Sequence, residues 1–388
     1  MSLWRRISAS TNLSPEGEQY VVVYAGNTAT TDNDLNLIAY PFDSVNGFGD
    51  RIVPTEFIED GFQGGGRVAF SPSGGGLATT SGTFIPATAG DFGLVSYGWD
   101  EGFGAQDVSA AKPSGADNVV FHPDGDIVFV SHAEGVIYGS RIFAYNWSDA
   151  TGYGTTRPTN GTVSNSSQDF LPIAVSPNGE FVALGYRYGH KLAIFPFSRS
   201  TGFGTVVEPS VNPISFNPGN VVVAWNNAGT YVALAAATTD PTERLSIFAW
   251  NNASGTFGAK VANVVIEPSL TTSSVGGQAV AFSPDDSAII LGVSVAGRQL
   301  QAYAWDNDTG TFGSQYSLPS TSGGTPTEIV FNTNGNVIFA SGGSSSNTPI
   351  AAYQWDSETG FGVKYDNPDI TGLGAQYDAY SIDYKDFG

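Results

Sequence analysis

Short runs of apolar residues, some alternating with polar ones, recur along the whole chain, and many of them end in a turn. The run Leu300–Asp306 alternates with the two-residue period of a strand that is buried on one side. Val68–Pro72 ends in a Ser-Pro turn, and Glu180–Gly185 is rich in small and apolar residues. No stretch keeps the longer apolar period of a capped helix. The pattern therefore predicts an all-β protein with essentially no helix.

Two markers alternate along the chain and divide it into seven repeats of about 50 residues. The first marker is a turn of the Ser-Pro-x-Gly type, as in Ser71–Gly74 and Ser176–Gly179. The second is an aromatic strand that ends in Thr-Gly-Phe-Gly or a close variant, as in Phe195–Gly204 and Tyr353–Gly362. The repeats span residues 7–62, 63–114, 115–168, 169–218, 219–274, 275–325 and 326–375.

Each repeat reads as four short strands, a to d in chain order, which is typical of one blade of a β-propeller. One small sheet leaves both faces exposed, so copies must stack, and closing them into a ring protects the strand edges. The seven repeats therefore predict that residues 1–388 form one domain, a seven-bladed β-propeller of four-stranded antiparallel blades. The alternating segment 376–388 predicts a strand that closes the ring by adding to the first blade, beside Ile7–Leu13.

Aromatic residues stand at two fixed places in the repeat, which favours packing between blades over a sugar-binding surface. The first place holds Trp99, Trp147, Trp250, Trp305 and Trp355, with phenylalanine in the remaining repeats. Trp225 replaces a phenylalanine of strand a, and we expect it in the core as well.

Composition narrows the range of partners. The 388 residues carry a formal net charge of −21, which repels nucleic-acid backbones and anionic lipid. No run is apolar enough to cross a membrane, and the first residues lack the apolar stretch of a signal peptide. The absence of cysteine excludes disulfides and thiolate metal sites. Neither nucleic-acid binding nor membrane insertion is expected.

No local motif predicts an active site, a metal site or a cofactor. Asp306–Gly310 begins like a calcium loop but lacks the later carboxylate, which favours an ordinary hairpin turn. His122, His132 and His190 fall in different repeats or at different strand ends, so we do not expect them to share a metal. No carboxylate pair stands out for glycoside hydrolysis, although such pairs can converge from distant loops. The sequence thus predicts a protein that is not an enzyme.

The Trp-Asp pairs at Trp99, Trp305 and Trp355 end strand c of their repeats, where WD-repeat propellers carry theirs. The repeat resembles a divergent WD repeat without that family's Gly-His pair, and the resemblance implies the propeller fold. The phrasing Tyr-x-Trp-Asp-x-x-Thr-Gly-Phe-Gly with Phe-Ser-Pro-x-Gly is also similar to repeat proteins encoded by tailed bacteriophages. This second resemblance implies a virion component in the tail, the fibre or the capsid decoration.

Three functions remain open. The first is a non-enzymatic bacteriophage virion protein, located in the virion and bound to other virion proteins. The second is a lectin-like propeller that recognises a host-surface glycan. The third is a polysaccharide hydrolase or lyase.

A partner is expected on the face that carries the b–c and d–a loops, because these vary in length and sequence while the opposite turns are uniform. Variable loops on a rigid scaffold are the usual place for binding. The best candidate lies between strands b and c of the fourth repeat, where cations and aromatic rings gather in an acidic protein. Its binding residues would be Tyr186, Arg187, Tyr188, His190 and Lys191.

Overall fold

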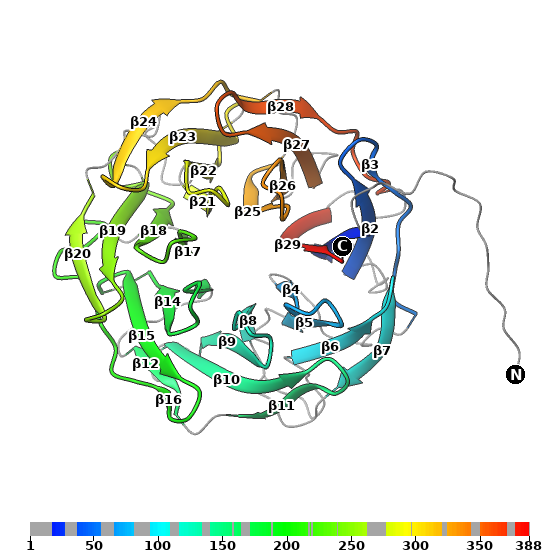
Figure 1. The fold of residues 1–388 in the computed structure, drawn as a ribbon, viewed down its shortest axis with the longest axis horizontal. Coiled ribbons are helices and arrows are strands. Elements are labelled where there is room, and N and C mark those ends of the chain that lie inside the picture. Colours follow the sequence, from blue (N-terminus) through cyan, green and yellow to red (C-terminus); the bar gives the residue numbers. More distant parts are fainter. Residues whose placement is uncertain are drawn as a thin grey trace, which may run out of the picture.

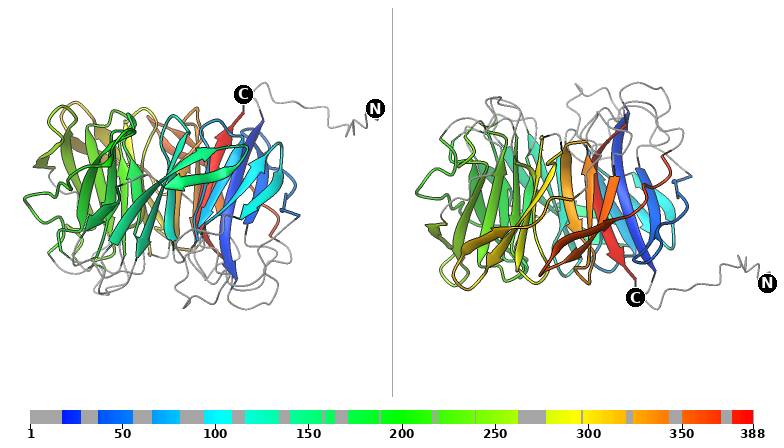
Figure 2. Two further views of the ribbon diagram at one scale, coloured as in Figure 1. Left: turned by 90° about the horizontal axis from the view of Figure 1, so that it is seen from below. Right: turned by 90° about the horizontal axis from the view of Figure 1, so that it is seen from above.

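The computed structural model describes residues 18–27, 37–55, 66–80, 94–108, 116–133, 140–156, 159–163, 171–187, 189–215, 218, 220–238, 240–261, 277–295, 297–319, 324–342, 350–370 and 377–387. These residues form seven antiparallel sheets arranged as a ring around one axis (Figure 1), and side views show a short, thick disc (Figure 2). The ranges contain no helix, and hence none that could span a membrane. The predicted all-β, seven-bladed propeller is confirmed.

Six blades are built from consecutive strands, with the first strand innermost. Blade 2 holds β4 (Val68–Phe70), β5 (Gly76–Thr80), β6 (Leu94–Trp99) and β7 (Phe103–Val108), and blade 3 holds β8 (Ala116–Phe121), β9 (Ile127–Ala133), β10 (Ser140–Ser148), β11 (Gly152–Thr156) and the short β12 (Gly161–Val163). Blade 4 holds β13 (Ile173–Val175), β14 (Phe181–Gly185), β15 (Leu192–Ser198) and β16 (Gly202–Phe203), and blade 5 holds β17 (Val221–Trp225), β18 (Tyr231–Ala236), β19 (Leu245–Asn251) and β20 (Thr256–Lys260). Blade 6 holds β21 (Gly277–Phe282), β22 (Ala288–Val293), β23 (Leu300–Asp306) and β24 (Thr311–Gln315), and blade 7 holds β25 (Pro326–Phe331), β26 (Val337–Gly342), β27 (Ile350–Asp356) and β28 (Gly360–Lys364).

Blade 1 joins the two ends of the chain, as predicted. It contains β1 (Gln19–Asn27), β2 (Leu37–Asp43) and β3 (Gly47–Phe48), and the C-terminal β29 (Tyr377–Asp386) supplies its innermost strand. The closing strand β29 takes the innermost place of blade 1 and pairs with β1. Ile7–Leu13 lies outside the described residues.

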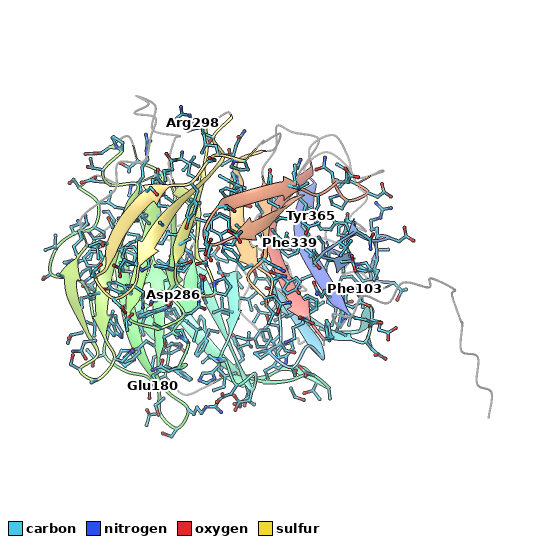
Figure 3. All side chains as sticks on the ribbon, turned by 45° about the horizontal axis from the view of Figure 1, so that its top comes forward. Phe103, Glu180, Asp286, Arg298, Phe339 and Tyr365 are labelled. Carbon is cyan, nitrogen blue, oxygen red and sulfur yellow. The ribbon has the colours of Figure 1, made fainter. Side chains whose placement is uncertain are left out.

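The core consists of apolar layers between neighbouring blades, and the repeated aromatic residues fill them. The rings of Tyr20 in blade 1 and Trp99 in blade 2 meet edge to face, with centroids 5.3 Å apart. At the junction of blades 7 and 1, Phe42 contacts both Phe339 and Tyr365, which Figure 3 shows close together. Such ring pairs add about 0.5–1.5 kcal/mol beyond their burial. The prediction that the repeated tryptophans belong to the core is confirmed, since Trp99, Trp147, Trp250, Trp305 and Trp355 are all buried.

Polar side chains connect the a–b turns of neighbouring blades. Asp286 (Figure 3) occupies the turn position that is glycine in most repeats, and its φ of 56° is left-handed. Its carboxylate accepts the N–H groups of Asn227 and Ala228 in the turn of blade 5, at 2.7 and 2.8 Å. These bonds between blades offset the strain that this φ imposes on a residue with a side chain.

Candidate functional site

The predicted binding run lies between β14 and β15, and the structure buries part of it. Tyr186 and Lys191 are only 1% and 4% exposed, so neither offers a free side chain to a partner. The His190 side chain is half-exposed, Arg187 is partly exposed, and Tyr188 lies outside the described residues. The binding role of this run stays a prediction, and it narrows to Arg187 and His190 among the residues that the structure describes.

Glu208, from the segment that follows β16, contacts two side chains of this run. Its Oε1 accepts a hydrogen bond from the hydroxyl of Tyr186 at 2.5 Å, and its Oε2 lies 3.8 Å from Nε2 of His190. Burial and the neighbouring carboxylate raise the pKa of Tyr186 well above its usual range. The aromatic Tyr186 and the basic His190 therefore hold the hairpin between β14 and β15 against Glu208. Several other loops expected on the same face, including 28–33, 82–92 and 343–348, lie outside the described residues.

A second group of polar and charged residues, which sequence reasoning missed, stands on or next to β4, β8, β25 and β29. These are innermost strands of their blades, around the axis of the ring (Figure 1). We call it the axial cluster. It consists of Arg67, Asp117, Glu328, Ser381 and Asp383, from blades 2, 3, 7 and 1. Nη1 of Arg67 lies 4.0 Å from Oε2 of Glu328. Burial lowers the pKa of Arg67, and the carboxylates of Glu328 and Asp117 oppose that change.

β-Bulges place two of these acids. In β8, Asp117 is the extra residue between the pairs Ala116–His132 and Asn118–Ser131. In β25 the register shifts in the same way immediately before Glu328. A bulge bends its strand and turns the local side chains away from strict alternation. The two acids therefore depart from strict alternation along their strands.

The carboxylate of Glu328 is anchored by one oxygen only. Its Oε2 accepts hydrogen bonds from the hydroxyl of Ser381 at 2.7 Å and from the N–H of Ile382 at 3.0 Å. Its Oε1 accepts none from the residues that the structure describes, and the side chain is 34% exposed. A carboxylate fixed in this way beside a guanidinium can take a proton from a water molecule. Ser381 is fully buried and acts as a positioning residue.

Asp383 joins the closing strand to blade 2. Its Oδ2 accepts the N–H of Phe70 at 2.7 Å, and Ser381 accepts the N–H of Val68 at 3.2 Å. Burial raises the pKa of Asp383 to about 7, because it outweighs the hydrogen bonds from Phe70 and Tyr384. This carboxyl therefore gains or loses its proton near neutral pH.

The raised pKa of Asp383 makes ring stability depend on pH. Its folded-state pKa lies above the usual 3.8, so the folded protein is at full stability below pH 4 with respect to this group and loses stability as the pH rises to about 7. We expect Asp383→Asn to remove this loss. The stability difference between variant and wild type should grow by about 3–4 kcal/mol between pH 4 and pH 8. Thermal unfolding across this range measures it, and a difference that does not change with pH would contradict the assignment.

The residues considered for metals serve other purposes. Among the described residues, no group of three or more His, Cys, Asp or Glu is placed to hold a metal ion. Oδ1 of Asp306 accepts the N–H groups of Asp308 and Thr309, both at 3.0 Å, as in an ordinary hairpin turn. His122 lies 3.1 Å from the guanidinium of Arg199, which joins blades 3 and 4.

Arg67 and Glu328 had a signal in the sequence. Both stand three residues before the strand-a phenylalanine of their repeats, Phe70 and Phe331. Other repeats have an uncharged residue at this place, such as Asn118, Val222 and Ala279. A charged residue at a repeat position that is uncharged in other repeats was the signal in the sequence. Only the closed ring shows that Arg67 and Glu328 lie close together.

Two hollows lie between blades, outside the axial cluster. One of about 350 Å³ is lined by Trp355, Asp356 and Tyr365 of blade 7 and by Ser44 of blade 1. Another of about 280 Å³ lies between blades 1 and 2.

No family model matches the sequence, and no curated protein matches it. Solved structures share the fold at low sequence identity. A provisionally assigned 6-phosphogluconolactonase from Bacteroides uniformis is 13% identical with a TM-score of 0.68, covering 95% of this chain and 100% of that one. A periplasmic gluconolactonase from Pseudomonas aeruginosa is 14% identical with a TM-score of 0.67, covering 94% and 99%. A chain of the mitotic checkpoint complex, a WD40 propeller, is 13% identical with a TM-score of 0.50, covering 78% and 77%.

These comparisons support the propeller part of the WD-like resemblance and contradict two expectations. The chain was expected to be a non-enzymatic bacteriophage virion component and not an enzyme. Structures that share the fold over nearly their whole length include a gluconolactonase and a provisionally assigned 6-phosphogluconolactonase, and this finding overturns both expectations. The tyrosines and tryptophans of the motif that suggested a phage protein are buried and pack the blades together. At 13% and 14% identity, the likeness to these structures shows the fold alone.

Proposed function

We propose that the protein is a hydrolase of cyclic sugar esters and that the axial cluster is its active site. The observation that carries this proposal is the carboxylate of Glu328, which holds one oxygen fixed and the other free beside a guanidinium. The fold of the lactonases, which hydrolyse such esters, supports the same reading. Of the three functions considered from the sequence, hydrolysis is the one that the comparisons favour.

The reaction follows from general acid–base chemistry. Glu328 Oε1 accepts a proton from a water molecule while the water oxygen attacks the lactone carbonyl carbon. The negative charge that forms on the carbonyl oxygen is stabilised by Arg67, whose positive charge the carboxylates of Glu328 and Asp117 favour. The bond between the carbonyl carbon and the ring oxygen then breaks. Glu328 returns its proton to the ring oxygen, which becomes the hydroxyl of an open-chain hydroxy acid.

The charge around the cluster favours a neutral substrate. Arg67 faces the two acids Glu328 and Asp117, and the whole chain carries a net charge of −21. A phosphorylated lactone would meet this negative field without a free cation in the cluster to bind its phosphate. The neutral glucono-lactone is therefore the better substrate.

Hydrolysis assays test the proposal directly. We expect purified protein to speed the opening of glucono-1,5-lactone at pH 6 above the rate in buffer, and to act more weakly on the 6-phosphate. Acid release is followed with a pH indicator, and the rate in buffer is subtracted for each substrate. Rates equal to those in buffer for both lactones would overturn the proposed function. A clear preference for the phosphorylated lactone would overturn the charge argument.

A further inference from the structure

Asn118 stands at the repeat position that carries the charged pair of the axial cluster. It lies three residues before the phenylalanine that ends strand a, as Arg67 and Glu328 do in their repeats. The residue before it is Asp117, whose carboxylate favours the positive charge of Arg67. Strand β8 is the innermost strand of blade 3 (Figure 1), so Asn118 belongs to the wall around the axis of the ring.

The side chain of Asn118 is buried without a hydrogen-bond partner. The residue is 8% exposed, and its amide makes no hydrogen bond with any residue that the structure describes. Its partner in the ladder, Ser131, donates its hydroxyl hydrogen to the carbonyl oxygen of Leu171 in the fourth repeat, at 2.5 Å. Burying an amide costs free energy unless a new partner replaces the lost water. An unpaired amide in this place therefore indicates a bound molecule that completes its hydrogen bonds.

The propeller fold does not require an amide at this position. Blade 5 has Val222 there and blade 6 has Ala279, and both strands keep their pairing with strand b. In blade 6 the register shifts immediately before Ala279, as it does before Asn118, so the two positions also match in register. Packing of the blades therefore gives no reason for the asparagine, and its role lies at the axis.

An amide suits the hydroxyl groups of a sugar lactone. Its oxygen accepts hydrogen bonds, and its NH₂ group donates them. One asparagine can therefore accept from one hydroxyl of a sugar ring and donate to the next. The amide also adds no charge to a cluster that already holds a guanidinium and carboxylates, so it does not disturb the pairing of Arg67 with Glu328.

We propose that Asn118 is a specificity-determining residue of the axial cluster and that it binds two neighbouring hydroxyl groups of a polyhydroxylated lactone. The choice of ligand rests on the proposed function, in which the lactone carbonyl lies at Glu328 and Arg67. A site that is built to bond hydroxyl groups rejects an analogue without them, because its buried polar group then stays unpaired. The protein should therefore prefer an aldonolactone to a plain cyclic ester.

Kinetics of Asn118→Ala on two lactones tests the proposal. Glucono-1,5-lactone carries the hydroxyl groups, and δ-valerolactone has the same ring without them. We expect the substitution to lower kcat/KM about 10- to 100-fold for gluconolactone, the effect of losing two hydrogen bonds, and no more than about twofold for valerolactone. The variant should fold, because Ala279 occupies the same position in blade 6.

Asn252→Ala is the matched control, because Asn252 is an exposed asparagine in the c–d turn of blade 5. It should leave kcat/KM unchanged for both lactones. Equal losses for the two lactones in Asn118→Ala would indicate a structural effect and overturn the proposal. An unchanged kcat/KM for gluconolactone would overturn it as well.

Calorimetric binding of glucono-1,5-lactam, which resists hydrolysis, separates this proposal from the proposed function. We expect the wild type to bind the lactam and Asn118→Ala to bind it about 10- to 100-fold more weakly. If the wild type opens neither lactone but shows this difference in lactam binding, the hydrolase proposal fails and the binding role of Asn118 stands. Equal lactam affinity in the two proteins, or no binding to the wild type, would overturn the role of Asn118.

Discussion

Replacing Glu328 by glutamine is expected to lower kcat for lactone hydrolysis by about 10²–10⁴-fold, the usual contribution of a general base. The amide oxygen of glutamine can still accept the hydrogen bonds of Ser381 and Ile382, so the side chain should keep its place. An amide cannot take up a proton from water at neutral pH, and this loss removes the activation of the nucleophile. Steady-state kinetics over a range of pH measures the effect.

Glu180→Gln supplies the control for this measurement. Glu180 is exposed, follows the a–b turn of blade 4, and accepts a hydrogen bond from Asn178, far from the axial cluster. Its replacement should leave both kcat and the melting temperature unchanged. If Glu328→Gln keeps at least half of the wild-type kcat, Glu328 is not the base, and another group must activate the water.

Ending the chain at residue 376 is expected to abolish cooperative folding. The shortened chain lacks β29, so β1 loses its partner over Gln19–Asn27. The apolar layer between blades 7 and 1 loses the buried Ile382, and Glu328 loses both of its hydrogen-bond donors. An open ring also leaves the inner edge of blade 1 unpaired, which favours aggregation.

Soluble yield, size-exclusion chromatography and circular dichroism melts measure this outcome, and a chain that lacks only Gly388 is the control. A synthetic peptide of residues 377–388, added during refolding, should restore part of the monomeric, folded population. If the shortened chain is monomeric with an unchanged melting temperature, the closing strand does not hold the ring together.

Much of the fold could be predicted from the sequence because local and repeated features determine it. Alternation in runs such as Leu300–Asp306 gave the strands, and the alternating segment at the end of the chain gave the closing strand. The pairing of that strand with β1 was not predicted, because the sequence does not show which strand the closing segment joins. Register and pairing are properties of the assembled sheet.

The candidate site could not be predicted in the same way. Arg67 and Glu328 lie in the second and seventh repeats, and they meet only because the ring closes through β29. The bulge at Asp117 depends on pairing between strands, which leaves little trace in local sequence. The burial of Tyr186 in the candidate run could not be read from the local sequence either, since Glu208, further along the chain, accepts a hydrogen bond from its hydroxyl. The binding role of the run stays a prediction. The virion role was predicted wrongly because the repeated motif that suggested it consists largely of residues that pack the blades together. A fold does not determine a function.

The closing strand has a consequence for biosynthesis. Strand β1 leaves the ribosome early, yet its partner β29 is among the last segments made. At about 5–20 residues per second, the inner edge of β1 waits on the order of 20–70 s for that partner. During this time the nascent chain carries an unpaired strand that could pair with a neighbouring chain on the same messenger RNA. We therefore expect the protein to depend on ribosome-associated chaperones, and slower translation to lower its yield.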